Sequence, residues 1–194
     1  MALYNISKKT VKALYSFLFK VEVIGLEHTN IDGPVIVCAN HISNYDPPLL
    51  GITFPQKIHF MAKAELFKVP VLSTLLTDFG AFPVSRGAGD KKALRAGLQI
   101  LKDGKVLGLF PEGHRSKDGS FGEPQSGVGF FALKSDATVI PCAIISTYKF
   151  KKRVRIVYGE PVDLSELKEK RGASKDAAKK IMDEIIRLHD THKF

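Results

Sequence analysis

Short apolar runs alternate with amphipathic stretches along most of the chain, and this alternation predicts its elements. Apolar or alternating runs predict β-strands at residues 21–24, 35–38, 57–62, 79–84, 106–110, 138–145 and 153–158. Helical periodicity or helix-start signals predict helices at residues 5–20, from residue 47, and at 66–76, 90–102, 129–134 and 174–189. Such alternation is typical of an α/β fold, so we expect a mostly parallel sheet flanked by helices. Because proline cannot donate a ladder hydrogen bond, we expect the strands containing Pro83 and Pro141 to run to a sheet edge or an irregular end.

The helix predicted at residues 5–20 is amphipathic. Its apolar side chains share one face, widened by two phenylalanines: Val11, Leu14, Tyr15, Leu18, Phe17 and Phe19. The opposite side carries Lys9, Lys12, Ser16 and Lys20. A basic face opposite an aromatic-rich apolar face is typical of a helix that lies in a membrane interface. A helix packed on a protein core has the same periodicity, so both interpretations are open at this point.

Composition predicts one domain of 194 residues with a sizeable core and a basic surface. The chain has 29 Lys and Arg against 20 Asp and Glu, a formal net charge of +9. This excess favours an anionic partner: a nucleic acid, an anionic membrane surface or a phosphorylated substrate. No apolar run approaches the roughly 18–20 residues of a spanning helix, and no signal-peptide cleavage site follows an apolar N-terminal core. We therefore expect any contact with a membrane to be peripheral.

The cysteines and histidines predict no metal site. Cys38 and Cys142 both lie in apolar, strand-like runs, which favours buried free thiols in a reducing cytoplasm. The spacing of the histidines outside the predicted loops does not match metal ligands, either with each other or with the cysteines. These histidines are His28, His59, His189 and His192.

A histidine and an aspartate follow the predicted strand at residues 35–38. His41 comes directly after the strand end, and Asp46 lies five positions later, before Pro47 and Pro48. This order predicts a helix start, because aspartate caps free main-chain amides and proline fits the first turn. A histidine paired with a carboxylate can act as a general base, since the carboxylate fixes the tautomer and stabilises the imidazolium. The same spacing also occurs in purely structural pairs, so the two residues alone do not establish a catalytic site.

Two further charged loops follow predicted strands: one ends at Arg86, and the other contains Glu112 and Arg115. Loops at the carboxyl ends of parallel strands gather in one crevice, so we expect these residues near His41. Arginines bind phosphate through charge-assisted hydrogen bonds, and Glu112 could orient a hydroxyl or brace an arginine. The set favours transfer onto a hydroxyl of a phosphorylated molecule. Because the chain has no Gly-x-Ser-x-Gly nucleophile elbow, we expect direct attack by that hydroxyl.

Four ordered segments resemble the motifs of the glycerolipid acyltransferases. They are Asn40-His41-x-x-x-x-Asp46, Gly80-x-Phe82-Pro83-Val84-x-Arg86, Phe110-Pro111-Glu112-Gly113-x-Arg115-Ser116 and Val139-Ile140-Pro141-Cys142-Ala143. Their order and spacing agree with the family from about residue 20 to residue 160. Within that family the chain most resembles the 1-acylglycerol-3-phosphate (lysophosphatidate) acyltransferases.

The resemblance implies an activity and a site. His41 and Asp46 would form a catalytic dyad that deprotonates the hydroxyl of lysophosphatidate for attack on an acyl thioester. The residues implied to bind the acceptor are Arg86, Glu112, Gly113, Arg115 and Lys63. The thioester, acyl-CoA or acyl carrier protein, would be a co-substrate, and no cofactor is implied. His114 stands where the third motif usually has threonine. The replacement could be neutral or could alter the acceptor pocket, and we favour a neutral replacement.

The resemblance also favours the membrane interpretation of the N-terminal helix, because substrate and product would both carry fatty chains. We therefore divide the chain into a membrane-association helix at residues 1–20 and an acyltransferase domain at residues 21–194, placed peripherally on the cytoplasmic face of the cell membrane. A basic cluster suits anionic lipid headgroups: Lys149, Lys151, Lys152, Arg153 and Arg155. A solvated strand edge and steering of an acidic acyl carrier protein are alternative explanations of that cluster.

Three alternative functions remain. A related acyltransferase could use another lysophospholipid or glycerol 3-phosphate as its acceptor. A nucleic-acid-binding module would explain the charge, but the chain has no recognisable nucleic-acid motif and few aromatic residues among its basic ones. A non-catalytic lipid-binding relative is disfavoured, because His41 and Asp46 are both present.

Overall fold

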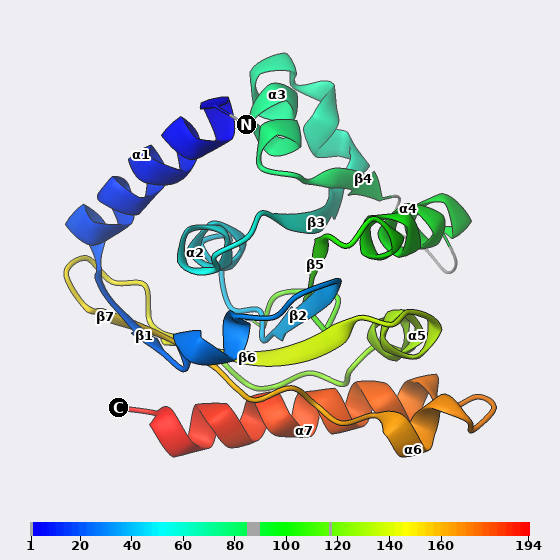
Figure 1. The fold of residues 1–194 in the computed structure, drawn as a ribbon. Helices are drawn as coiled ribbons and strands as arrows, with labels where there is room; N and C mark the ends of the chain where they lie inside the picture. Colours follow the sequence, from blue (N-terminus) through cyan, green and yellow to red (C-terminus); the bar gives the residue numbers. More distant parts are fainter. Residues whose placement is uncertain (1, 85–89, 117) are drawn as a thin grey trace.

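Strand β2 (Val35–Ala39) carries five consecutive buried side chains, and the fold is built around it. The computed structural model describes residues 2–84, 90–116 and 118–194 (Figure 1). Val35 and Val37 belong to one hydrophobic core, whereas Ile36 and Cys38 belong to another. Successive side chains of a strand face opposite sides of a sheet, so both faces of β2 must be covered.

The described strands form one seven-stranded sheet. They are β1 (Lys20–Ile24), β2 (Val35–Ala39), β3 (Ile58–Lys63), β4 (Phe82–Val84), β5 (Val106–Leu109), β6 (Thr138–Ser146) and β7 (Arg153–Tyr158). Their order across the sheet is β1-β7-β6-β2-β5-β3-β4. Among these described strands, every neighbouring pair is parallel except β6 and β7. The predicted α/β fold with a mostly parallel sheet is therefore confirmed.

Helices cover both faces of this sheet (Figure 1). They are α1 (Ala2–Leu18), η1 (Leu26–Thr29), α2 (Asp46–Thr53), η2 (Ala64–Lys68), α3 (Pro70–Asp78), α4 (Lys91–Lys102), α5 (Ser126–Lys134), α6 (Ser165–Lys168) and α7 (Ser174–His192). Helices α1 and α2 pack on one face, and α4, α5 and α7 pack on the other. Helices α5 and α7 approach closely at Gly129, where an added Cβ would lie 1.9 Å from the Ser174 carbonyl oxygen.

The directions of the strands bring several loops together. Strands β2, β5 and β3 are parallel neighbours and end at the same edge of the sheet, which we call the carboxyl edge. Strand β7 runs antiparallel to β6, and β1 runs parallel to β7, so both of these strands begin at the carboxyl edge. The carboxyl edge therefore carries His41, the loop after β5 and the turn between β6 and β7.

Local signals determine several helix starts. Pro70 is at the first turn of α3 and ends the preceding η2, as its position in the apolar segment predicts. Asp90 caps α4 by accepting hydrogen bonds from the N–H groups of Lys92 and Ala93, at 3.0 and 3.1 Å. Strand β4 is shorter than the predicted 79–84, because Phe79 and Gly80 still bond to the last turn of α3.

The prediction for Pro141 is wrong. Pro83 lies in the edge strand β4, as expected, but Pro141 lies in β6, between β7 and β2. The carbonyl of Pro141 accepts a hydrogen bond from the Gly159 N–H at 2.9 Å, one residue beyond the end of β7. The N and C=O of one strand residue point toward the same neighbouring strand. The nitrogen of Pro141 therefore faces the end of β7, and its missing N–H does not interrupt the hydrogen bonds between β6 and β2.

Helix α1 packs on the core with one face and leaves a second apolar face exposed. Its core-facing side chains, together with the residue that follows the helix end, are Val11, Tyr15, Leu18 and Phe19. Leu14 and Phe17 do not belong to this face, contrary to the predicted grouping, and are 52% and 62% exposed. Core packing is thus confirmed for one face, and the membrane-association assignment of residues 1–20 stays a prediction. Over the described parts of the chain, no helix is both long and apolar enough to cross a membrane.

Candidate active site

His41 and Asp46 are hydrogen-bonded at the carboxyl edge, as their spacing predicts. The Nδ1 of His41 lies 2.8 Å from Oδ2 of Asp46. The imidazole is 16% exposed, whereas the carboxylate is fully buried. With Nδ1–H donating to the carboxylate, a neutral imidazole has its lone pair on Nε2. The pair can therefore accept a proton at Nε2 and stabilise the resulting imidazolium.

Asp46 interacts with the chain before it, not with helix α2 as a cap. Its Oδ2 also accepts hydrogen bonds from the N–H groups of Ile42 and Ser43, both at 2.7 Å. The predicted capping of α2 is therefore wrong. The prolines at positions 47 and 48 explain this, because they have no N–H to offer the carboxylate. The carboxylate instead closes the turn that carries His41.

Glu112 holds the main chain of His41. This side chain is 1% exposed. Its Oε1 accepts a hydrogen bond from the His41 N–H at 2.8 Å, and its Oε2 accepts one from the Gly122 N–H at 3.2 Å. The Ser116 N–H donates to the His41 carbonyl at 2.7 Å. The loop after β5 is therefore fixed to the peptide groups on both sides of His41.

Two residues next to the dyad complete its support. The ring of Phe110 stacks on His41, with centroids 4.0 Å apart and an interplanar angle of 19°. Asn40 is 2% exposed, and its amide bonds both main-chain groups of Ile144, at 2.7 and 3.0 Å. Strand β6 is thereby fixed next to the end of β2. The sequence places both residues in motifs, but it does not reveal these contacts.

Tyr148 is the functional candidate that sequence reasoning missed. It lies in the turn between β6 and β7, and its hydroxyl donates to Oδ1 of Asp46 at 2.6 Å. The two residues are 102 positions apart. Its segment reads as a polar, basic turn in the sequence, so no local signal could have linked it to the dyad.

The loop after β5 forms an open depression of about 410 Å³ next to His41. Its lining residues are Glu112, His114, Arg115, Ser116, Asp118, Ser120 and Gly122. Arg115 and His114 are exposed there, and Gly113 turns the chain with a φ of +71°, a conformation that favours glycine. Hydrogen bonds from Ser120 keep the pKa of Asp118 below its ordinary value. The depression thus combines an exposed cation with an ordered polar turn.

The other predicted acceptor residues come from β3 and from the segment after β4. Lys63 is exposed at the end of β3, in register with Val84 of β4. Arg86 lies outside the described residues. The structure therefore brings His41, Asp46, Glu112, Gly113 and Arg115 together, and it places Lys63 at the same carboxyl edge, farther across the sheet.

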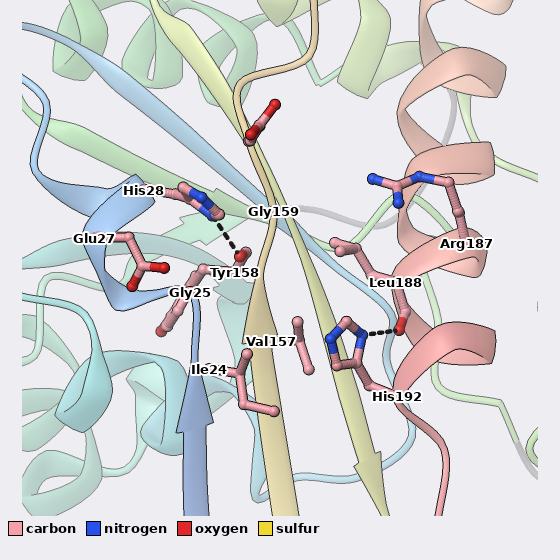
Figure 2. Close-up of a pocket in the computed structure, with 11 residues that line it drawn as sticks. Ile24, Gly25, Glu27, His28, Val157, Tyr158, Gly159, Arg187, Leu188 and His192 are labelled. Carbon is pink, nitrogen blue, oxygen red and sulfur yellow. Dashed lines mark hydrogen bonds between the residues drawn. The ribbon is translucent and has the colours of Figure 1, made fainter.

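A second cavity, of about 330 Å³, lies at the opposite edge of the sheet (Figure 2). His28 and His192 line it from either side of β7, and each Nδ1 donates to a main-chain carbonyl, of Tyr158 and Leu188 respectively, at 2.9 Å. None of the predicted site residues that the structure describes lines this cavity. In the same described residues, no three His, Cys, Asp or Glu side chains gather as metal ligands. The candidate active site is therefore the His41 region.

Comparisons with known proteins agree with this location. The family model described as Acyltransferase matches residues 20–145, which contain His41, Asp46, Glu112 and Arg115. The 1-acyl-sn-glycerol-3-phosphate acyltransferase of Bacillus subtilis (strain 168) is 27% identical over 166 residues, covering 82% of this chain and 82% of that protein.

A solved structure and a second relative extend the comparison. The crystal structure of the 1-acyl-sn-glycerophosphate (LPA) acyltransferase PlsC from Thermotoga maritima superposes with a TM-score of 0.77 at 28% identity, covering 95% of this chain and 79% of that one. A lyso-ornithine lipid O-acyltransferase of Pseudomonas aeruginosa is 33% identical over 112 residues, covering 57% of this chain and 43% of that protein. The similarity therefore includes relatives whose names give different acceptors.

Proposed function

The chain belongs to the acyltransferase family, and from this we propose that it transfers a fatty acyl group from a thioester to the free hydroxyl of 1-acylglycerol-3-phosphate, giving phosphatidate. The observation that carries the proposal is the His41–Asp46 hydrogen bond of 2.8 Å next to the Arg115 loop. A base and a phosphate-binding cation then lie at the same edge of the sheet. Relatives named for this reaction support the choice of acceptor.

The proposed chemistry needs one base. Nε2 of His41 takes the proton of the acceptor hydroxyl while its oxygen attacks the thioester carbonyl. Asp46 stabilises the imidazolium that forms. The tetrahedral intermediate then collapses, the C–S bond breaks, and the leaving thiolate takes the proton from the imidazolium. The products are the new oxygen ester and a free thiol, and His41 is again neutral.

Direct attack by the acceptor agrees with the state of the cysteines. Cys38 and Cys142 are fully buried in the two cores. Burial raises the pKa of both thiols, so neither forms a thiolate nucleophile at neutral pH. We therefore propose that the acyl group passes to the acceptor without an acyl-enzyme.

We propose that the acceptor phosphate binds Arg115 and Arg86, with Lys63 as a further cation. Gly113 would let the loop approach the phosphate closely, because it has no side chain. Glu112 would assist acceptor binding indirectly: both of its oxygens already accept main-chain N–H groups, and a carboxylate would repel a phosphate. Its role would be to hold the His41 peptide and the Arg115 loop in register.

A transfer assay that crosses two donors with four acceptors tests this function. The donors are acyl-CoA and acyl carrier protein, and the acceptors are lysophosphatidate, another lysophospholipid, glycerol 3-phosphate and lyso-ornithine lipid. We expect the highest kcat/KM with lysophosphatidate. A higher kcat/KM with another acceptor would keep the acyltransferase chemistry but replace the proposed substrate. Lyso-ornithine lipid is included because one relative is named for that acceptor. No transfer in any combination would refute the function.

We further propose that the protein works peripherally on the cytoplasmic face of an anionic membrane. Phe17 of α1 and Phe150 of the β6–β7 turn are 62% and 61% exposed, and their ring centroids lie 6.0 Å apart at the carboxyl edge. Lys151 Nζ lies 4.7 Å from the centroid of Phe17. Exposed aromatic rings beside lysines suit the interface of an anionic bilayer. Arg155, also in the basic cluster, is already paired with Glu22 at 2.8 Å.

The segment between β3 and β4 supports the same proposal. Neither η2 nor α3 has a buried residue. Their exposed apolar residues, with the one that joins them, are Leu66, Val69, Val71 and Leu75. Apolar side chains left uncovered on a helix indicate a partner surface, and lipid acyl chains at the membrane surface would cover them.

Sedimentation with vesicles tests the membrane proposal. Deleting residues 1–19 would also remove core residues, so the combined Phe17→Ser and Phe150→Ser substitution is the sharper change. We expect it to reduce sedimentation with anionic vesicles. Leu26→Ser is the matched control, because Leu26 is 44% exposed at the opposite edge of the sheet. Equal sedimentation of the double variant and the control would contradict the proposal.

A further inference from the structure

The two oxygens of Asp46 have different partners. Oδ2 accepts from His41 Nδ1 and from two main-chain N–H groups. Oδ1 accepts from the hydroxyl of Tyr148, at 2.6 Å. The carboxylate is fully buried. The three donors to Oδ2 and the Tyr148 hydroxyl on Oδ1 together fix the rotation of the carboxylate about its Cβ–Cγ bond, and Tyr148 is the donor that holds the oxygen turned away from His41.

Tyr148 acts as a donor in this contact. Burial and the negative charge of Asp46 raise the pKa of Tyr148 above its ordinary value, so the phenol keeps its proton at neutral pH. A charge-assisted O–H···O⁻ bond is short and strong, which agrees with the observed 2.6 Å. The phenol thus supplies a permanent donor to Asp46.

The fold holds Tyr148 in an unfavourable backbone conformation at this position. Its φ is +48°, which is uncommon for a residue other than glycine. The Tyr148 N–H donates to the Ser146 hydroxyl at 2.8 Å. The centroid of the Tyr148 ring lies 5.5 Å from that of Phe19 and 5.3 Å from that of Tyr45. Such strain persists only where surrounding contacts fix it, and it is common near functional sites.

We infer that Tyr148 is a positioning residue for the dyad, and this inference rests on the proposed general-base function of His41. Its hydroxyl holds Asp46 in the orientation that keeps Nδ1–H of His41 bonded and Nε2 directed to the acceptor. In this role Tyr148 acts through Asp46 and not on the substrate. Its loss should therefore slow the chemical step without weakening substrate binding.

Tyr148→Phe tests the inference, because it removes only the hydroxyl. We expect kcat to fall by about 10- to 100-fold, the effect of losing a hydrogen bond to a charged group, with both KM values changed less than about twofold. Tyr158→Phe is the matched control. The Tyr158 hydroxyl lies 2.8 Å from Oγ1 of Thr53, a contact that does not involve the dyad, so that variant should keep the wild-type kcat.

Proton NMR supplies a measurement that does not depend on activity. The Nδ1–H signal of His41 should move in Tyr148→Phe and stay in place in Tyr158→Phe. An unmoved signal, or a kcat within about twofold of the wild type, would overturn the inference. Loss of the folded spectrum in Tyr148→Phe would also overturn it, because the hydroxyl would then be structural. Wild-type protein without transfer activity would instead refute the proposed function, and the NMR result would still decide whether Tyr148 positions the pair.

Discussion

Glu112→Gln separates two roles of this glutamate. In the structure each carboxylate oxygen accepts one main-chain N–H, from His41 at 2.8 Å and from Gly122 at 3.2 Å, and the side chain is 1% exposed. Glutamine keeps the shape but replaces one acceptor oxygen with an NH₂ donor. One of the two N–H groups would then face another donor, and its hydrogen bond would be lost.

The size of the effect follows from burial. A buried donor without a partner costs about 1–3 kcal/mol of the free energy of unfolding. For a domain of this length each kcal/mol lowers Tm by about 2–4 °C, so we expect a decrease of about 2–12 °C. Because the Glu112 side chain also holds the His41 peptide, kcat should decrease as well.

Thermal unfolding of the substrate-free protein measures this directly. Glu123→Gln is the matched control: Glu123 is exposed in the same loop region, and surface substitutions change stability by no more than about 0.5 kcal/mol. If Glu112 instead bound the acceptor directly, the variant would raise the acceptor KM and leave Tm unchanged. That result would refute the role argued from its two main-chain contacts.

Asp46, the two arginines and the half-buried His59 each give a further prediction. Asp46→Asn should lower kcat by about 10²–10⁴-fold, because an amide cannot stabilise the imidazolium; steady-state kinetics with a nearly wild-type kcat would contradict this. Arg115→Ala and Arg86→Ala should each raise the acceptor KM by about tenfold or more and leave the donor KM unchanged, whereas equal changes in both would contradict phosphate binding. Burial lowers the pKa of His59 in the folded protein. As the pH falls, His59 is therefore protonated first in the unfolded chain, at about pH 6.5, and the free energy of unfolding decreases below that pH. His59→Gln should therefore flatten the decrease in Tm between about pH 7 and pH 5; an unchanged slope would refute this assignment.

The strands and the main loops of the site could be predicted because their signals are local. The apolar run at residues 35–38 predicts a buried strand, and the observed strand, Val35–Ala39, is covered on both faces. Parallel strands bring the loops at their carboxyl ends together. The hydrogen bond between His41 and Asp46 follows from the same reasoning, since a short turn after a strand end brings residues five positions apart into contact.

The remaining features depend on contacts between distant segments. Tyr148 reaches Asp46 across 102 positions, and Glu112 reaches the His41 peptide across 71. Pro141 is tolerated inside the sheet because β7 ends beside it, which requires knowledge of the strand order. Leu14 and Phe17 of α1 fit an apolar helix face by periodicity, but the packing of α1 on α2 determines which side of that face is covered.

Transfer of a labelled acyl group to lysophosphatidate, measured for wild-type protein and for His41→Ala, tests the proposed general-base role of His41. Both acyl-CoA and acyl carrier protein thioesters should be supplied, with thermal unfolding as a check that the variant is folded. We expect labelled phosphatidate from the wild type and a loss of at least about 10²-fold in the variant, the usual contribution of a general base. Substantial transfer by folded His41→Ala would contradict the role of His41 as the general base.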